Sequence, residues 1–413
     1  MQFAILVSVI IAVLLGSFLT LSHTHRLFNL QSNLVLKTID NVNLGIGYGN
    51  NAKTIFTDSI TLPPEEENIA NTIVRRRFWG GFELLESESS FKATKFKKLA
   101  LVGSQLPKTP ISLVLSENKI PLVLVGDTKI EGTAYISDKG VKAGSISGHY
   151  FTGTKLINGQ IHYGQNSLPQ LLPSWEHHIA QFSDFIPSQE DIVIPIGEEN
   201  KNSFFNPTQV IFQPEELVLN ETYIGNILIK SDSEIRISKH ATIIDATLVA
   251  PKIIIEKGFL GNLSCIASES IVIEEGVKLS YPSALIIKEK TNKATSQSTN
   301  ATKASISIVG DSHISGYLVF LEDRNPSSTN RTKVNIVIGS KATIQGQLYC
   351  QGSTQLDGTV LGSVFTKRFV TKGFGSVYVN HIYNGKILGY DLNSAYCGLP
   401  FLNYNKGVTK WLY

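Results

Sequence analysis

The N-terminus of the chain is almost entirely apolar. Phe3 to Leu21 form a run of 19 residues without a charged side chain. An α-helix of that length spans about 28 Å, close to the roughly 30 Å hydrocarbon core of a bilayer. We therefore predict a transmembrane anchor helix over residues 1–25. Its apolar surface is made by Phe3, Ile5, Leu6, Ile10, Ile11, Val13, Leu14, Leu15, Phe18 and Leu21.

A cleaved signal peptide is the alternative to a retained anchor. Signal peptides carry a basic first region, a shorter apolar stretch and a small-residue cleavage site. None of these features occurs between Met1 and Leu30, so the retained anchor is favoured. The nearest basic residues, Arg26 and Lys37, follow the helix, and the positive-inside rule alone would place that side in the cytoplasm. We predict the opposite side, because the polar, β-rich remainder is typical of an exported domain.

The second half of the chain repeats a pattern of β-branched residues. The triplet Ile-x-Ile starts at residues 235, 253 and 271, at equal intervals, and returns at 306 and 336. The two longer intervals contain polar inserts, 289–304 and 322–333, and each shortens to nearly the same period when its insert is removed. Alternation with period two predicts strands, and a fixed longer period predicts stacked coils. We therefore predict a mainly β fold, a parallel β-solenoid of about 18 residues per coil, over residues 221–373.

Two other interpretations of this pattern are less favoured. Glycines at 258, 276, 339 and 346 would interrupt a helix, and β-branched pairs with period two favour strands. An ordinary β-sandwich would need all the short strands of the repeat to share one period by chance.

The rest of the chain divides around this repeat. Leu122-x-Leu124 followed by regularly spaced glycines predicts first solenoid coils over residues 121–165. Residues 166–220 are rich in proline and are predicted to be an insertion with one short helix, Trp175 to Phe182, capped by Ser174. Residues 26–120 are predicted to be a small extracytoplasmic β-rich segment. The glycine cluster at 45, 47 and 49 lacks the spacing of a nucleotide-binding motif, so we expect a loop there.

Aromatic residues concentrate at the C-terminus, with nine in residues 374–413. A solenoid needs a cover on its last coil, so we predict an aromatic C-terminal cap. Tyrosine and tryptophan also concentrate binding energy at interfaces. A partner-docking surface is therefore the second interpretation, with the candidate residues Tyr390, Tyr396, Phe401, Tyr404, Trp411 and Tyr413.

Charge and cysteine content exclude several classes of function. Lys and Arg number 37 against 34 Asp and Glu, a net charge of +3, and no basic stripe marks a nucleic-acid surface. Three cysteines, Cys265, Cys350 and Cys397, are too few and too distant for a disulfide framework or a zinc site. Cys265 and Cys350 fall at inward positions and are expected to be buried. We predict no metal, no cofactor and no nucleic-acid partner.

Few residues suggest catalysis. His240 and His313 lie at predicted coil corners, where hexapeptide-repeat acyltransferases carry a histidine base, but no tandem hexapeptide motif accompanies either one. Asp245, Asp311 and Asp357 are single acids in different contexts, whereas polysaccharide-cleaving solenoids need carboxylates stacked on adjacent coils.

Two further clusters are expected to be solvated surface. His177 and His178 are adjacent on the predicted helix and point about 100° apart, which disfavours a shared metal ion. Arg75, Arg76 and Arg77, followed by lysines at 92, 95, 97 and 98, could bind acidic lipid or an acidic partner. A solvated edge of the β-rich segment is the favoured interpretation.

Two resemblances bear on function. Residues 336–364 (IVIGSKATIQGQLYCQGSTQLDGTVLGSV) resemble bactofilins, polymer-forming bacterial scaffolds with three-sided coils, which implies a scaffolding role. The layout of an apolar N-terminal helix that runs into a globular domain is similar to pilins and pseudopilins. The chain as a whole resembles membrane-anchored envelope proteins of bacteria.

We accordingly predict a non-enzymatic, membrane-anchored structural or assembly component of the bacterial cell envelope, with a pilus-like or secretion-type assembly as one form. The predicted location is the inner membrane, in a single pass, with most of the chain extracytoplasmic. Membrane lipid and other envelope proteins, or further copies of the chain, are the predicted partners. A carbohydrate-active or acyl-transferring solenoid enzyme remains the alternative.

Overall fold

The computed structural model describes residues 2–51, 59–62, 71–117, 119–164, 166–182, 185, 192–290, 305–323 and 332–412. The fold is mainly β, with one long N-terminal helix. The chain divides into two compact units. Unit 1 comprises Met1–Arg77 with Leu85–Leu99, and unit 2 comprises Phe78–Leu84 with Ala100–Tyr413.

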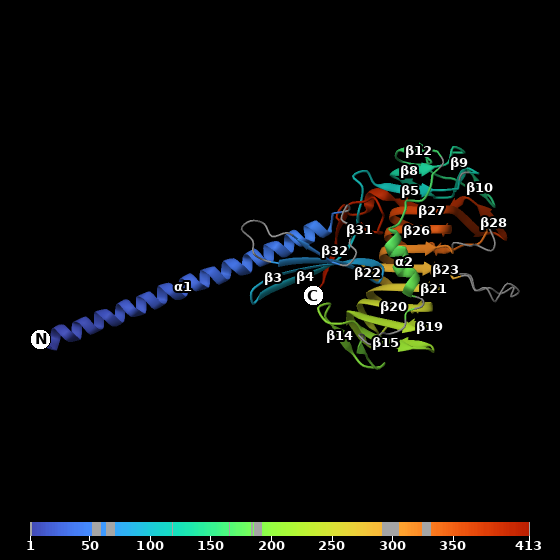
Figure 1. Cartoon of the computed structure of the whole chain (residues 1–413). Coiled ribbons are helices and arrows are strands. Elements are labelled where there is room, and N and C mark those ends of the chain that lie inside the picture. The colour runs from blue at the N-terminus through green and yellow to red at the C-terminus, as the bar shows by residue number, and fades with distance from the viewer. Residues whose placement is uncertain are drawn as a thin grey trace. The chain divides into compact units, whose positions relative to one another are not determined.

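Helix α1 runs from Gln2 to Gly49 (Figure 1). Its 48 residues correspond to a length of about 72 Å, more than twice the thickness of a hydrocarbon core. The prediction that residues 26–49 belong to a β-rich segment, with a loop at the glycine cluster, is therefore wrong. All three glycines, at 45, 47 and 49, lie in the last turns of the helix.

One sheet follows this helix in the chain. Strand β1 (Ser59–Leu62) pairs antiparallel with β2 (Asn71–Trp79), and β3 (Phe82–Phe91) and β4 (Thr94–Gln105) continue the same sheet. The two-residue connection Gly80-Gly81 is typical of a tight hairpin between antiparallel strands. Within the described residues, the predicted β-rich segment thus has its strands from residue 59 onward.

Unit 2 contains helix α2 (Pro173–Phe182), the 3-10 helix η1 (Gly389–Asp391) and the remaining strands. The strands before α2 are β5 (Ile111–Leu115), β6 (Leu122–Val125), β7 (Lys129–Glu131), β8 (Thr133–Ile136), β9 (Val141–Ala143), β10 (Ser145–Ile146), β11 (His149–Tyr150) and β12 (Ile161–Tyr163). The first strands after α2 are β13 (Ile192–Val193), β14 (Asn200–Asn202), β15 (Gln209–Gln213) and β16 (Leu217–Leu219). The later strands are β17 (Thr222–Gly225), β18 (Ile227–Ser231), β19 (Glu234–Ile237), β20 (Thr242–Ile255), β21 (Leu260–Ile273), β22 (Lys278–Lys288), β23 (Ser305–Ile308), β24 (His313–Leu321), β25 (Ile336–Ile338), β26 (Thr343–Leu356), β27 (Thr359–Gly373), β28 (Ser376–Val379), β29 (His381–Tyr383), β30 (Lys386–Leu388), β31 (Cys397–Gly398) and β32 (Lys406–Leu412).

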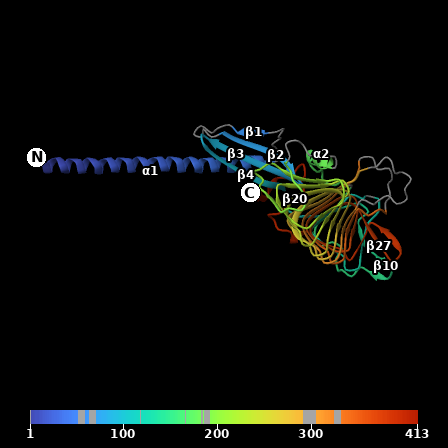
Figure 2. The ribbon, with the colours of Figure 1, turned by 90° about the horizontal axis from the view of Figure 1, so that it is seen from below.

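The repeated isoleucine triplets pair with one another in parallel. Ile235 is the register partner of Ile253, and Ile253 is the partner of Ile271. The series continues across both polar inserts, from Ile271 to Ile306 and from Ile306 to Ile336. Most of each insert, 291–304 and 324–331, lies outside the described residues. Figure 2 shows β20 to β27 as successive rungs, in agreement with the predicted parallel pairing.

The order of rungs in unit 2 departs from the order of the sequence. Strand β27 pairs in parallel with β5, where Val364 is the partner of Leu113, and β5 pairs with β8, which pairs with β12. The early strands β5, β8 and β12 therefore continue the parallel pairing beyond β27. The chain then continues through α2 to β13, which pairs with β15, and β15 pairs with β18. Strands β12 and β15 consequently lie at opposite ends of the stack (Figure 1).

Three predicted boundaries are corrected by these pairings. The strands in the region predicted to form the first coils begin with β5 at residue 111, not at 121. The segment 166–220, predicted to be an insertion, contains β13 to β16, which pair in parallel with later rungs. Its predicted helix is present, although it starts at Pro173, a residue type that is favoured at the first helical position. The segment 374–413, predicted to be a cap on the last coil, instead contributes β30 to the interior of the stack, where β30 pairs with both β27 and β7.

The interior of the stack is apolar and tightly packed. Cys265 and Cys350 are fully buried in it, as predicted, and burial raises the pKa of the Cys350 thiol to about 12. Gly316, Gly346 and Gly362 form a column at one corner, each with φ near +145°. A β-carbon on Gly346 would overlap the carbonyl oxygen of Gly316, and one on Gly362 would overlap that of Gly346. Glycine is therefore required at this corner for adjacent coils to approach.

Candidate functional site

The first half of helix α1 exposes its apolar side chains. Phe3, Phe18 and Leu19 are 78%, 68% and 67% exposed, and the other large apolar residues up to Leu21 are exposed as well. The hydroxyl groups of Ser8, Ser17, Thr20 and Thr24 donate hydrogen bonds to carbonyl groups of the same helix. Polar groups in a bilayer must be satisfied internally in this way. The helix is long and apolar enough to cross a membrane.

The exposed apolar surface of α1 continues beyond the length that a bilayer covers. His23, His25 and Arg26 interrupt it, as residues at a membrane boundary do. After them, apolar side chains are exposed again, on Leu27, Phe28, Leu30, Val35 and Leu36. Contiguous exposed apolar surface is unusual for a chain surrounded by water and is typical of interaction sites.

The last three turns of α1 have a different environment. Their buried residues recur every three or four positions and so lie on one face of the helix: Thr38, Asn41, Val42, Gly45, Ile46 and Gly49. A β-carbon on Gly45 would overlap Ser87 of β3, and one on Gly49 would overlap the Leu85 side chain. Gly47 lies on the other face, with nothing within 4 Å. The glycines thus let the helix approach the strand closely.

Several residues of the basic cluster at 75–77 and 92–98 form ion pairs within unit 1. Arg75 and Lys97 each contact the Glu86 carboxylate at 2.9 Å. Burial raises the pKa of Glu86, but hydrogen bonds and charge from Lys97, with further contributions from Arg75 and Arg77, outweigh it, so the pKa lies below its usual value. Lys98 donates to the Asn43 side chain of α1 at 2.6 Å. These residues therefore make contacts within unit 1. Arg75 is 44% exposed, as expected for a solvated edge, whereas the ion pairs with Glu86 were not expected.

The residues considered for catalysis are not brought together. His240 is exposed, and His313 lies 3.3 Å from the Ser315 hydroxyl. Asp245 forms an ion pair with Lys410 at 2.7 Å, and Asp357 accepts a hydrogen bond from Gln355. Asp311 is exposed. In the part of the chain that the structure describes, no group of three or more His, Cys, Asp or Glu side chains is arranged to hold a metal ion.

The histidine pair on α2 divides into an exposed and a packed residue. His177 is exposed and lies 3.0 Å from Gln181. His178 stacks on Phe78, with ring centroids 4.9 Å apart, and meets Phe182 edge-on. Burial lowers the pKa of His178 to about 4. A hydrogen bond to the backbone of Gly80 favours the charged form and raises the pKa, but burial has the larger effect. The packed histidine was not expected, because the sequence predicts only a surface helix.

The aromatic residues proposed for partner docking have unequal exposure. Tyr390 is 56% exposed, Trp411 is 41% exposed, and Tyr404 is half-buried. Tyr396 and Phe401 are 6% and 1% exposed, which corrects their assignment as docking residues. The hydroxyl of Tyr396 donates to the Gly316 carbonyl at 2.7 Å, so this tyrosine belongs to the packing of the coils. Tyr413 lies outside the described residues.

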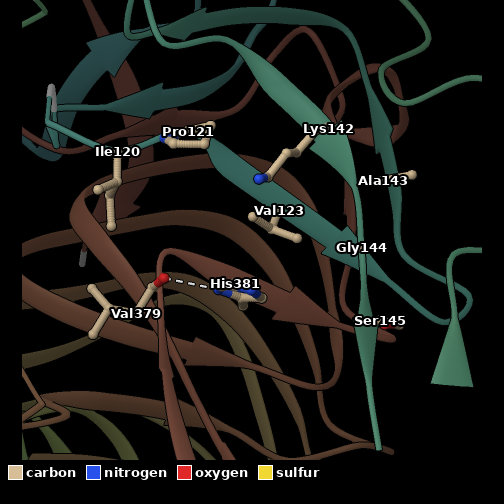
Figure 3. Close-up of a pocket in the computed structure, with 9 residues that line it drawn as sticks. All are labelled: Ile120, Pro121, Val123, Lys142, Ala143, Gly144, Ser145, Val379 and His381. Atoms are coloured by element: carbon tan, nitrogen blue, oxygen red, sulfur yellow. Dashed lines mark hydrogen bonds between the residues drawn. The ribbon is translucent and has the colours of Figure 1, made fainter. Parts of the chain in front are cut away.

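A hollow of about 340 Å³ opens on the outer surface of the early coils (Figure 3). Its lining combines apolar residues with one lysine and one histidine: Ile120, Pro121, Val123, Lys142, Ala143, Gly144, Ser145, Val379 and His381. His381 lies 2.8 Å from the Val379 carbonyl through Nδ1. The sequence does not signal this hollow, because residues near 123 and 381 meet only through strand register.

Comparison of the chain with protein-family models gives no match, and comparison with curated proteins gives none either. Among solved structures, the chain is similar to the competence-associated pilin ComZ from Thermus thermophilus. The alignment has 9% sequence identity and covers 92% of this chain and 98% of that one, with a TM-score of 0.19.

Proposed function

We propose that the protein is a membrane-anchored structural subunit of a pilus-like or related assembly in a bacterial cell envelope. In this proposal α1 holds the subunit in the inner membrane and packs against α1 of neighbouring subunits. The parallel coils of unit 2 are a β-solenoid that the subunit presents outside the cytoplasm.

The observation that carries the proposal is the exposure of α1 on both sides of its polar interruption. The stretch before His23 is long enough for a bilayer, which accounts for its exposed apolar side chains. Leu27, Phe28 and Leu30 lie beyond that stretch, where a single subunit would expose them to water. Apolar helices of neighbouring subunits are a cover of matching chemistry and length for them.

The solenoid assignment rests on the register of the coils. Ile235, Ile253 and Ile271 are successive parallel partners at equal spacing along the chain, and the pairing continues past two polar inserts. Each coil is then buried between its two neighbours, which distributes stability along a rigid stack. Such a stack suits a structural role, because it holds its outer surface in a fixed shape.

Isolation of the full chain from bacterial membranes tests the proposal directly. We expect the protein in the membrane fraction and, after mild solubilisation, in particles with several subunits when imaged by electron microscopy. Recovery from membranes as a monomer without protein partners would contradict assembly. Recovery from the soluble fraction would contradict the anchor.

Labelling of an introduced cysteine decides the side of the membrane. Ser90→Cys places a thiol on β3, and the three native cysteines are buried, so they give a low background. We expect a membrane-impermeant maleimide, added to intact spheroplasts, to label this thiol from the outer side of the inner membrane. Labelling only after lysis would place unit 1 in the cytoplasm.

A further inference from the structure

We propose that the hollow beside Val123 is a binding site for an acidic sugar residue of a polysaccharide. The site lies wholly within unit 2 and does not depend on the assembly of α1. It therefore adds a binding function to the structural one.

Strand register brings the polar groups of the site together. Strands β29, β6 and β9 are neighbours in one parallel sheet, in which His381 is the partner of Val123 and Val123 is the partner of Lys142. Residues in register on adjacent strands share one face of a sheet, about 4.8 Å apart. His381 and Lys142 thus flank Val123, with their backbones about 10 Å apart across the sheet.

The floor of the hollow is apolar and depends on a glycine. Val123 is 5% exposed, and a β-carbon on Gly144 would overlap its Cγ1 atom. Any side chain at residue 144 would consequently fill the space above Val123. Pro121 and Val379 extend the apolar surface. Such a surface suits the C–H face of a sugar ring, since ligand pockets combine apolar walls with a few placed polar groups.

The polar groups fit a carboxylate and a hydroxyl group. Lys142 is exposed and points toward the hollow in Figure 3, where its ammonium group can pair with a carboxylate. A carbonyl oxygen only accepts hydrogen bonds, so His381 Nδ1 carries the proton that it donates to Val379. In the neutral ring, Nε2 is then an acceptor, which suits a sugar hydroxyl. Burial, together with the charge of Lys142, lowers the pKa of His381 and favours this neutral form.

The charge of the lining selects acidic over neutral sugars. The described residues around the hollow include the lysine and the histidine, and none of the nine is an acid. A volume of about 340 Å³ is near the lower end for ligand sites and accommodates a single ring with its substituents rather than a large ligand. A repeating acidic polysaccharide would present many such residues to neighbouring subunits, so weak single contacts would add.

Calorimetric titration of the full chain in detergent micelles tests this site. The probes are trigalacturonate and triglucuronate, and the matched controls are their methyl esters, which remove the charge and keep the ring. We expect saturable binding of at least one acidic trisaccharide and binding about tenfold weaker for its ester, as loss of one charge-assisted contact implies.

Variants assign the binding to the hollow. Lys142→Gln is expected to weaken binding about tenfold, and Gly144→Leu to abolish it by filling the floor. Lys139→Gln removes a charge from the same segment outside the lining and should bind as the unaltered chain does. Equal binding of acid and ester, no saturable binding of either acid, or unchanged binding by Lys142→Gln would overturn the proposal.

Discussion

Gly45 of α1 and Ser87 of β3 are in such close contact that a β-carbon on residue 45 would overlap the Ser87 hydroxyl group. It would also lie 3.1 Å from a methyl carbon of Val74, another buried residue of the sheet. This contact lies in the last turns of α1, where the otherwise exposed helix packs against β3 within unit 1. The glycine is therefore needed for its lack of a side chain.

Substitution of the helix glycines tests this contact. Gly45→Val is expected to destabilise unit 1 by about 1–3 kcal/mol, because overpacking forces the helix away from β3. Gly47→Val is the matched control, since it makes the same change in helix propensity on a face with nothing within 4 Å. Chemical denaturation in detergent micelles measures both. Equal destabilisation would show that the close approach is unimportant.

The glycine column of unit 2 gives a second prediction. Gly346→Ala is expected to cost more than about 2 kcal/mol, because residue 346 has φ +147° and the new methyl group would meet the Gly316 carbonyl. Gly373→Ala, at the end of β27 with nothing within 4 Å, should leave the melting temperature nearly unchanged. Similar melting temperatures for the two variants would contradict the close approach of β24, β26 and β27 at this corner.

His178 makes the stability of unit 2 depend on pH. Its pKa is about 4 in the folded chain against an ordinary value of 6.5, so the unfolded chain binds more protons between these values. Stability is then complete above about pH 6.5 and falls as the pH is lowered toward 4, by roughly 3 kcal/mol. His178→Phe should flatten this dependence. His177→Phe, on the exposed neighbour, removes only the smaller contribution that the charge of His177 makes and should leave most of the dependence in place. Denaturation midpoints between pH 4 and 7 decide the matter.

The repeat shows how far the sequence alone predicts the fold. Ile253 and Ile271 could be paired in advance, because β-branched residues with one period have few other arrangements. The pairing of Leu113 with Val364 could not be predicted, because the period of the repeat does not show that an early strand lies beside a late one. The chain crosses from β12 through α2 to β13, at the other end of the stack. The early strands β5 to β12 therefore lie next to the late strand β27.

The candidate site was predicted only in part for a similar reason. The apolar run up to Leu21 is recognisable from composition, and it forms helix as predicted. The extension to Gly49 was missed because glycines favour loops by intrinsic propensity, and tertiary packing against β3 overrides that preference. The hollow at Val123 was missed because His381 reaches it from a distant part of the chain, a juxtaposition that only strand register creates.

The central claim is that α1 of one subunit packs against α1 of another, and site-specific photo-crosslinking in native membranes tests it most directly. A photoreactive residue at Phe28 lies beyond the bilayer stretch, whereas one at Val218, which is 43% exposed on β16, serves as the control. We predict covalent adducts between α1 segments, identified by mass spectrometry, from position 28 and none between α1 segments from position 218. Adducts from position 28 to lipid alone, or no adducts to any protein, would contradict the account.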